Sequence, residues 1–291
     1  MSRVKFRART PLRTPFAIRL LRNRPLAIFG VAIIAFNVLE AFSAPAISPY
    51  DPYGMQLSDK LQAPDAAHIF GTDQLGRDIL SRVIWGSRIS FEIGVVVVVL
   101  SLLIGIPLGL SAGYAGGWVD ESLMRITDIF LAFPALVLAI FIEAAIGPGL
   151  TNAMFSIAIV SWPTYARLVR GSAMSIKEND FVEAARAAGE GRLRVVFRHI
   201  FSNLLSPITV QSTLDMGGAV LTAAGLSFIG FGVQPPTAEW GAMVSSGRDY
   251  IAFAWWMTAF PGLAIFLFVL GFNLLGDWLN DYLNPRLRGV E

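Results

Sequence analysis

The chain has 291 residues, of which 54% are hydrophobic and 15% are charged, with a formal net charge of +2. Soluble domains carry about 25% charged residues, so this composition disfavours a water-soluble globule, and its hydrophobicity excludes intrinsic disorder. There is no cysteine, and the two histidines, His68 and His199, lie far apart. We therefore expect no disulfide, no metal site and no catalytic histidine cluster.

Six apolar stretches come close to or exceed the length that a helix needs to cross about 30 Å of hydrocarbon. They lie at 26–47, 93–112, 129–146, 150–166, 204–230 and 251–276. Buried helices of a large soluble protein rarely run so far with so few charges. The sequence therefore predicts an all-α polytopic membrane protein with six transmembrane helices.

These stretches divide the chain into successive segments. The apolar run after the basic N-terminus is too long for a cleavable signal, so we expect it to be retained. Within the segment between the first two spans, the pattern from Asp73 onward is amphipathic and predicts an interfacial helix. The expected divisions are a basic N-terminal segment (1–25), a first span (26–47), an extracytoplasmic segment (48–92), a five-helix core (93–276) that includes a cytoplasmic loop (167–203), and a cytoplasmic tail (277–291).

The distribution of lysine and arginine predicts the orientation, because cytoplasmic loops carry an excess of both. With the N-terminus inside, 18 of the 23 basic residues lie on the inner side. The outer five are Lys60, Arg77, Arg82, Arg88 and Arg248. Both termini are therefore expected in the cytoplasm.

Motifs for nucleotide hydrolysis and for hydrolase chemistry are absent from the sequence. None of the three lysines follows a glycine, so a P-loop cannot occur, and neither H-E-x-x-H nor G-x-S-x-G is present. The chain is not expected to be an enzyme. Any ATP hydrolysis must come from a partner.

Three of the predicted spans contain an acidic residue, which is a candidate functional site because a charge in hydrocarbon costs several kcal/mol unless it is paired or hydrated. Glu40 and Glu143 lie near span ends, where interfacial water is within reach. Asp215 lies deeper, one helical turn after Gln211. Either Asp215 and Gln211 line a translocation path, or Asp215 bonds to a neighbouring helix that the following glycine pair lets approach closely. The sequence leaves both interpretations open.

The 167–203 loop contains a short segment that is bounded at both ends. Asp180, with Glu183 three residues later, predicts an N-cap with its capping partner, and Gly189 predicts a left-handed C-terminal stop. The resulting helix, Phe181–Ala188, has about two turns and is marginal alone in water, so packing must hold it. Its surface favours a docked partner over a helix that rests on its own membrane domain, since it offers small residues, an aromatic anchor and polar handles: Ala184, Ala185, Ala188, Phe181, Glu183 and Arg186.

The same loop resembles the EAA loop of ABC importer permeases. The similarity is carried by Glu183-Ala184-Ala185, by Gly189, and by His199-Ile200 at the matching distance. In that family the loop forms a coupling helix, which sits in a groove of the ATP-binding subunit. The resemblance implies that the residues that couple to the ATPase are Asp180, Phe181, Glu183, Ala184, Ala185, Arg186, Ala188 and Gly189.

Further motifs resemble the DppC/OppC branch of these permeases and extend over roughly residues 70 to 288. They are Gly71-Thr-Asp-Gln-Leu-Gly-Arg-Asp78, Ala112-Gly-Tyr-Ala-Gly-Gly117, Leu131-Ala-Phe-Pro134, Leu226-Ser-Phe-Ile-Gly230, Gln234-Pro-Pro-Thr-Ala-Glu-Trp-Gly241, Asn273-Leu-Leu-Gly-Asp277 and Asn284-Pro-Arg286. The chain departs from the family pattern at two places. The family's His-Ile-Leu-Pro-Asn reads His199-Ile-Phe-Ser-Asn203 here, without the proline. Many relatives carry a glutamate near Ala223, and this chain does not.

The resemblance implies a type I ABC importer permease fold in the bacterial cytoplasmic (inner) membrane. The chain would form half of a translocation pathway for peptides; nickel complexes, glutathione and oligosaccharides are alternative cargoes. Its implied partners are a homologous DppB/OppB-like permease, two ATPase subunits that bind ATP and magnesium, an extracytoplasmic binding protein that docks on 48–88 and 232–250, and the lipid bilayer. No cofactor in this chain and no nucleic acid are implied.

Two other classes of membrane protein would be expected to show different sequence features. An ion-coupled secondary transporter would require several paired ionisable residues near the membrane midplane, and often an internal repeat. A polytopic membrane enzyme would require a cluster of catalytic polar residues at one interface. The chain shows one clear mid-span acid, no repeat, and histidines that do not cluster with acids in the sequence.

Overall fold

The computed structural model describes residues 25–283. The basic residues before Pro25 and the tail beyond Leu283, with the Asn284-Pro-Arg286 motif, lie outside the described residues. Regular structure in the described part is helical, apart from an isolated β-bridge between Thr72 and Asp78. The all-α prediction is confirmed.

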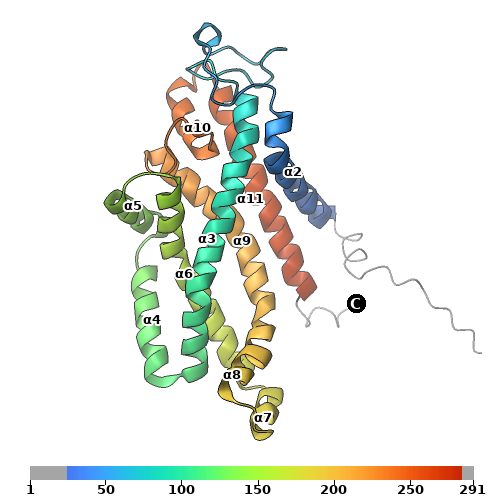
Figure 1. Ribbon diagram of the computed structural model, residues 1–291, viewed down its shortest axis with the longest axis vertical. Coiled ribbons are helices and arrows are strands. Elements are labelled where there is room, and N and C mark those ends of the chain that lie inside the picture. Colours follow the sequence, from blue (N-terminus) through green and yellow to red (C-terminus); the bar gives the residue numbers. More distant parts are fainter. Residues whose placement is uncertain (1–24, 284–291) are drawn as a thin grey trace, which may run out of the picture.

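Five long helices form the body of the molecule, and shorter helices connect them (Figure 1). The long helices are α2 (Pro25–Ile47), α3 (Ile79–Ala115), α6 (Leu150–Lys177), α9 (Ser202–Ile229) and α11 (Trp256–Leu283). The shorter ones are η1 (Leu57–Asp59), α4 (Gly117–Leu131), α5 (Ala135–Ile146), α7 (Asp180–Ala187), α8 (Arg192–Arg194), the π-helix η2 (Val195–Phe201), α10 (Trp240–Gly247) and η3 (Arg248–Tyr250).

Each of the six predicted spans falls largely within helix. Four helical stretches are long and apolar enough to cross a membrane: α2, α3, α11 and the continuous run from Arg192 to Ile229. The bent pair α4 and α5 would supply a fifth span if it is counted as one. The remaining prediction, 150–166, falls in the first part of α6, which has 28 residues but is less apolar than the other long helices.

Two boundaries differ from the sequence-based expectation. The expected interfacial helix and the second span form one helix, α3, whose 37 residues extend over about 55 Å. The third predicted span is broken between Leu131 and Ala135, where α4 and α5 meet at 88°. The cause is Pro134, which has no N–H to donate and which disfavours helical conformation at Phe133.

The molecule is elongated and has two distinct ends (Figure 1). The segment between α2 and α3 lies with α10 at one end, called here the α10 end, and the α3–α4 turn lies with α7 and α8 at the other, the α7 end. Between them, α3 packs along α6 through Gly105, Gly109 and Gly113, where an added Cβ would come within 3 Å of α6 atoms. Small residues one turn apart let two membrane helices approach this closely.

Candidate functional site

The short helix α7 projects at the α7 end, and one side chain fixes it to the body of the molecule. Val182 is fully buried in a cluster formed with α3, α6 and α9 residues, among them Leu110, Val169 and Leu204. Val182 was not singled out from the sequence, although its spacing from Arg186 places both on one helix face. Phe181, the predicted anchor for a docked partner, is 46% exposed.

The predicted N-cap of this helix is wrong. Asn179, not Asp180, occupies the N-cap position, and no side chain caps the first turn. The Asn179 amide instead donates to the carbonyl oxygens of Ser175 and Ile176, both at 3.1 Å, and so ties α7 to the end of α6. Asp180 and Glu183 are exposed on the first turn. Their negative charges interact favourably with the positive end of the helix dipole there.

The predicted C-terminal stop is confirmed. Gly189 has a φ of +83°, its N–H donates to Arg186 O at 3.0 Å, and the Glu190 N–H donates to Ala185 O at 3.1 Å. This pair of bonds is a Schellman motif. The face beyond Val182 remains open, since Ala184, Ala188 and Glu183 are exposed. Most of the expected coupling residues therefore share a rigid, accessible surface.

The chain returns from α7 to the body through the π-helix η2, which runs into α9 without a break. His199 lies in this π-helix, and its Nε2 is 2.9 Å from Glu190 Oε2. Asn203 donates its amide to the His199 carbonyl at 2.6 Å. The segment that lacks the family's proline is thus a widened helical turn, and π-helical turns are frequent at functional sites.

A cavity of about 220 Å³ lies between the middle parts of the long helices, beside the α4–α5 break. Asp215 lines it from α9 and Tyr165 from α6, while Ser101 and Leu131 contribute from α3 and α4. Among the described residues, Asp215 is the only one that lines the cavity with a carboxylate, and the Gln211 amide donates to Asp215 Oδ1 at 3.0 Å. Tyr165 was not identified from the sequence, because nothing in its neighbourhood distinguishes it from a core aromatic.

The structure of α9 around Asp215 has features that fit each of the two interpretations, pathway lining and close helix packing. Gly217 packs closely on α11, where an added Cβ would lie 3.2 Å from Val269 Cα. A Cβ added at Gly218 would meet nothing within 4 Å, and Gly218 lines the cavity with Asp215. Close packing and cavity lining therefore belong to adjacent glycines on different faces of the same helix.

The other two acids of the predicted spans have different surroundings. The expectation that Glu143 reaches interfacial water is wrong, since it is fully buried and its Oε1 accepts the Gly232 N–H at 2.6 Å. This bond joins α5 to the segment after α9. Glu40 is half-buried and lines an apolar groove between α2, α3 and α11.

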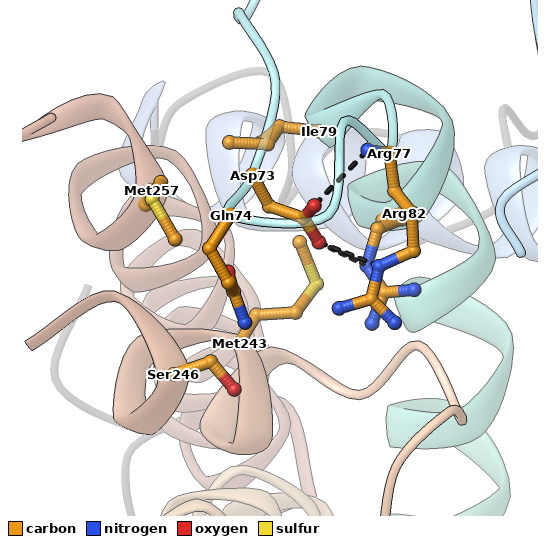
Figure 2. Close-up of a pocket in the computed structure, with 8 residues that line it drawn as sticks. All are labelled: Asp73, Gln74, Arg77, Ile79, Arg82, Met243, Ser246 and Met257. Carbon is orange, nitrogen blue, oxygen red and sulfur yellow. Dashed lines mark hydrogen bonds and ion pairs between the residues drawn. The ribbon is translucent and has the colours of Figure 1, made fainter. Parts of the chain in front are cut away.

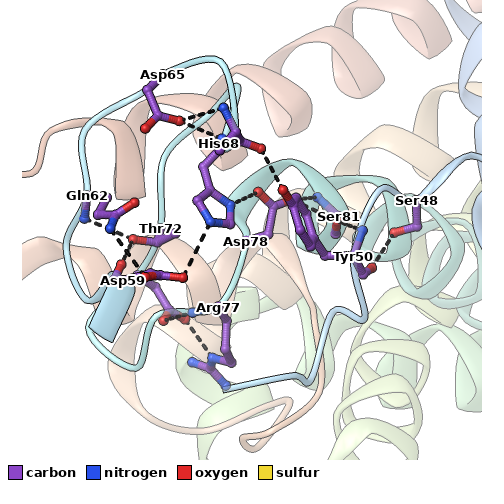
Figure 3. Close-up of polar contacts among 12 residues, drawn as sticks. Ser48, Tyr50, Asp59, Gln62, Asp65, His68, Thr72, Arg77, Asp78 and Ser81 are labelled. Carbon is purple, nitrogen blue, oxygen red and sulfur yellow. Dashed lines mark hydrogen bonds and ion pairs between the residues drawn. The ribbon is translucent and has the colours of Figure 1, made fainter. Parts of the chain in front are cut away.

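The Gly71–Asp78 motif forms a polar network at the α10 end (Figure 3). Asp73 accepts the Leu75 and Arg77 N–H groups and the Arg77 Nε, the last at 2.6 Å. Asp78 caps α3 by accepting the Ser81 N–H at 2.7 Å, and its other oxygen lies 2.9 Å from His68 Nδ1. The charged residues of the motif therefore stabilise a loop at the start of α3.

Figure 2 shows how this network meets α10 and α11. Asp73, Arg77 and Arg82 face Met243 and Met257 across a cavity of about 20 Å³, which holds little more than one water molecule. It is too small for a transported solute. Arg82 also donates to Pro52 O at 2.9 Å, which ties α3 to the segment after α2.

The second motif at this end, Gln234–Gly241, positions α10. Glu239 is fully buried and caps α10 by accepting the Gly241 and Ala242 N–H groups, both at 2.8 Å. Burial raises the pKa of the Glu239 carboxyl above its usual range, and the two N–H groups oppose that rise. The Trp240 indole donates to Val83 O at 2.9 Å, so α10 is fixed to α3.

Two ion pairs join α4 to α6 along the half nearer the α7 end. The Arg170 guanidinium donates to both Asp120 oxygens at 2.6 Å, and Arg167 donates to Asp128 at 2.5 Å. The Asp120 side chain is only 15% exposed, whereas Asp128 is 62% exposed. The bidentate pair is therefore the stronger connection.

Comparison with known families identifies the architecture. Residues 105–289, more than half of the chain, match the family described as the binding-protein-dependent transport system inner membrane component. The chain belongs to this family. Residues 15–64 match the N-terminal TM domain of oligopeptide transport permease C. The predicted membership in the DppC/OppC branch of ABC importer permeases is confirmed.

Individual relatives match over nearly the whole chain. The dipeptide transport system permease protein DppC of Alkalihalophilus pseudofirmus is 46% identical over 94% of this chain and 90% of its own length. The probable D,D-dipeptide transport system permease protein DdpC of Escherichia coli is 46% identical over 94% and 91%. The glutathione transport system permease protein GsiD of Pectobacterium atrosepticum is 43% identical over 96% and 93%.

A solved structure supports the fold independently. An inward-facing structure of the MetNI methionine ABC transporter matches with a TM-score of 0.57 and 20% sequence identity, over 71% of this chain and 98% of that chain. The type I ABC importer permease fold is thus confirmed. The protein is a multi-pass membrane subunit of a binding-protein-dependent importer, a system whose ATPase and substrate-binding functions reside in other subunits.

Proposed function

We propose that this chain forms half of a translocation pathway for di- and oligopeptides, together with a homologous permease subunit. The observation that carries the proposal is its 46% identity, over 94% of the chain, to a dipeptide permease. The cavity that Asp215 lines supports it, because a carboxylate in a membrane-embedded cavity provides a hydrogen-bond acceptor for the N–H and ammonium groups of a peptide. Glutathione is a second candidate, since a glutathione permease is 43% identical to this chain.

We propose that α7 is the coupling helix, with Asp180, Phe181, Glu183, Ala184, Ala185, Arg186, Ala188 and Gly189 as coupling residues. The exposed Ala184 and Ala188 let another backbone approach, and Phe181 offers a partly exposed aromatic anchor. In this proposal ATP-driven closure of the two ATPase subunits brings the coupling helices together and opens the pathway outward, and hydrolysis resets it. The buried Val182 and the Schellman stop support the transmission of such a displacement, because they keep α7 rigid.

The orientation is proposed with the α7 end in the cytoplasm. The α10 end then faces outward and offers the docking surface for the binding protein through 48–88 and 232–250. Its polar network supports this role, since a loop held by buried charges presents a fixed shape to a partner.

The test of cargo uses the assembled importer, with its sister permease, ATPases and binding protein, in proteoliposomes loaded with ATP. Uptake of a labelled dipeptide is compared with uptake of glutathione, a nickel complex and an oligosaccharide. We expect ATP-dependent dipeptide uptake that an excess of unlabelled peptide suppresses. Uptake of another solute alone, with no competition by peptides, contradicts the peptide proposal and leaves the permease assignment intact.

A further inference from the structure

A polar cavity of about 550 Å³ lies at the α7 end, between α7 and the ends of α3 and α6. Its lining combines three basic side chains with one acid and few apolar groups: Tyr114, Ala115, Lys177, Arg186, Glu190, Arg192 and Val195. Arg186 shares the α7 face of Val182, so it points toward the membrane domain and away from the exposed alanines. Arg186 is one of the proposed coupling residues, but Lys177 and Arg192 are not, so the proposed coupling surface accounts for only part of this cavity.

Two of the three basic groups make contacts that leave their charge available, and the third is exposed. Lys177 Nζ donates one hydrogen bond, to Gly113 O at 3.1 Å, and an ammonium has two further donors. The Arg186 guanidinium carbon lies 5.7 Å from the centroid of the Tyr114 ring. Arg192 is exposed, and its side chain makes no hydrogen bond or ion pair with the described residues.

The nearby acids offset only part of this charge. Glu190 is the one acid among the described residues that line the cavity, and its Oε2 lies 2.9 Å from His199 Nε2. Asp120, the acid nearest to Lys177 on α4, is bound on both oxygens by Arg170. Three cations against one carboxylate leave the lining with a net positive charge, which favours an anion in the cavity.

The surroundings of the cavity indicate where the anion comes from. Leu193 and Phe197, which follow Arg192, are 75% and 62% exposed, and Trp118 in the first turn of α4 is 80% exposed. Exposed tryptophan and apolar side chains beside basic residues are typical of the membrane–water interface. Basic pockets between membrane helices bind anionic lipid headgroups.

We propose that this cavity binds the phosphate-bearing headgroup of an anionic phospholipid. Lys177, Arg186 and Arg192 contact the phosphate, and Leu193 and Phe197 lie against the acyl chains. The bound lipid joins the end of α3 to α7 and so restrains the short helix. The inference requires only that the chain is a membrane protein, and it is independent of the transported solute.

The test uses the complete importer in nanodiscs of phosphatidylcholine with a minor fraction of phosphatidylglycerol. Native mass spectrometry measures the phosphatidylglycerol retained by the wild type, by Arg192→Gln, and by Lys177→Gln combined with Arg192→Gln. We expect each removed cation to lower the affinity about fivefold. Arg194→Gln is the matched control, because Arg194 is exposed two residues from Arg192 and does not line the cavity. Arg192→Gln alone keeps the test valid if the double variant assembles poorly.

Competition by inorganic phosphate and glycerol 3-phosphate separates a lipid from a soluble anion. The proposal requires that phosphatidylglycerol stays bound in excess phosphate. Displacement by phosphate, with the same loss in the variants, overturns it in favour of a soluble anion. Unchanged lipid retention in the double variant also overturns it; if the ATPase subunits then dissociate more easily, the cavity binds an acidic group of that partner.

Discussion

Asp215 places a carboxylate in the middle of a long membrane helix, where it lines a cavity. Its Oδ1 accepts one hydrogen bond from Gln211 at 3.0 Å, which leaves acceptor capacity free. We predict that Asp215→Asn lowers the rate of ATP-dependent uptake about tenfold without loss of assembly, since hydrogen bonds to a charged group contribute about 1.5 kcal/mol or more. Transport and complex yield are measured together in proteoliposomes.

Thr213 provides the matched control for this substitution. It lies on the same helix, its hydroxyl donates to Thr209 O within the helix at 2.9 Å, and it does not line the cavity. Thr213→Val should leave uptake unchanged. Normal uptake with Asp215→Asn would assign Asp215 to packing only.

Gly76 is constrained both by its conformation and by its surroundings. Its φ is +73°, and an added Cβ would lie 1.9 Å from the carbonyl oxygen of Gln56. We predict that Gly76→Ala destabilises the network at the α10 end by about 2 kcal/mol or more, because strain at positive φ adds to a backbone clash. Limited proteolysis should cut the variant faster within 48–78. Gly54→Ala is the control, since its nearest neighbour would lie at 3.4 Å and its φ is not positive.

At the scale of the element, α7 depends on the turn that ends it. Gly189 has open space around it and a φ of +83°, so a side chain there is disfavoured by backbone conformation alone, by about 1–2 kcal/mol. We predict that Gly189→Val frays α7 and uncouples ATP hydrolysis from uptake, measured as the number of ATP molecules hydrolysed per solute transported. Gly191→Val should have no effect, because Gly191 also has open space and a φ of −66°. Equal coupling ratios in the two variants would contradict the role of α7.

The helices show which local features a sequence reveals. The extent of α7 was predicted to within one residue at each end, because the Gly189 stop is encoded by residue type. Its N-cap was not, since the choice between Asn179 and Asp180 depends on α6 carbonyls that the sequence does not place. Pro134 is a known helix breaker, but the apolar residues on both sides of it made the 129–146 stretch resemble one continuous span.

For the whole molecule, hydropathy predicts where the membrane-spanning helices lie but not which of their residues contact one another. Arg170 and Asp120 are 50 positions apart, and neither was singled out as half of a pair. The burial of Glu143 likewise depends on Gly232, 89 positions away. Hydropathy measures how each segment prefers lipid to water, whereas the side chains that meet are determined by how whole helices cross.

The orientation of the whole molecule can be tested directly, because the chain has no cysteine of its own. Ser58 is exposed in η1, at the α10 end, and Ser175 is exposed near the end of α6, at the α7 end. We predict that a membrane-impermeant maleimide labels Ser58→Cys in intact spheroplasts and Ser175→Cys only in inverted vesicles, since 18 of 23 basic residues are assigned to the inner side. The unsubstituted chain controls for background labelling. The opposite pattern would invert the proposed orientation, and labelling of both sites from one side would contradict the assignment of the two ends to opposite faces of the membrane.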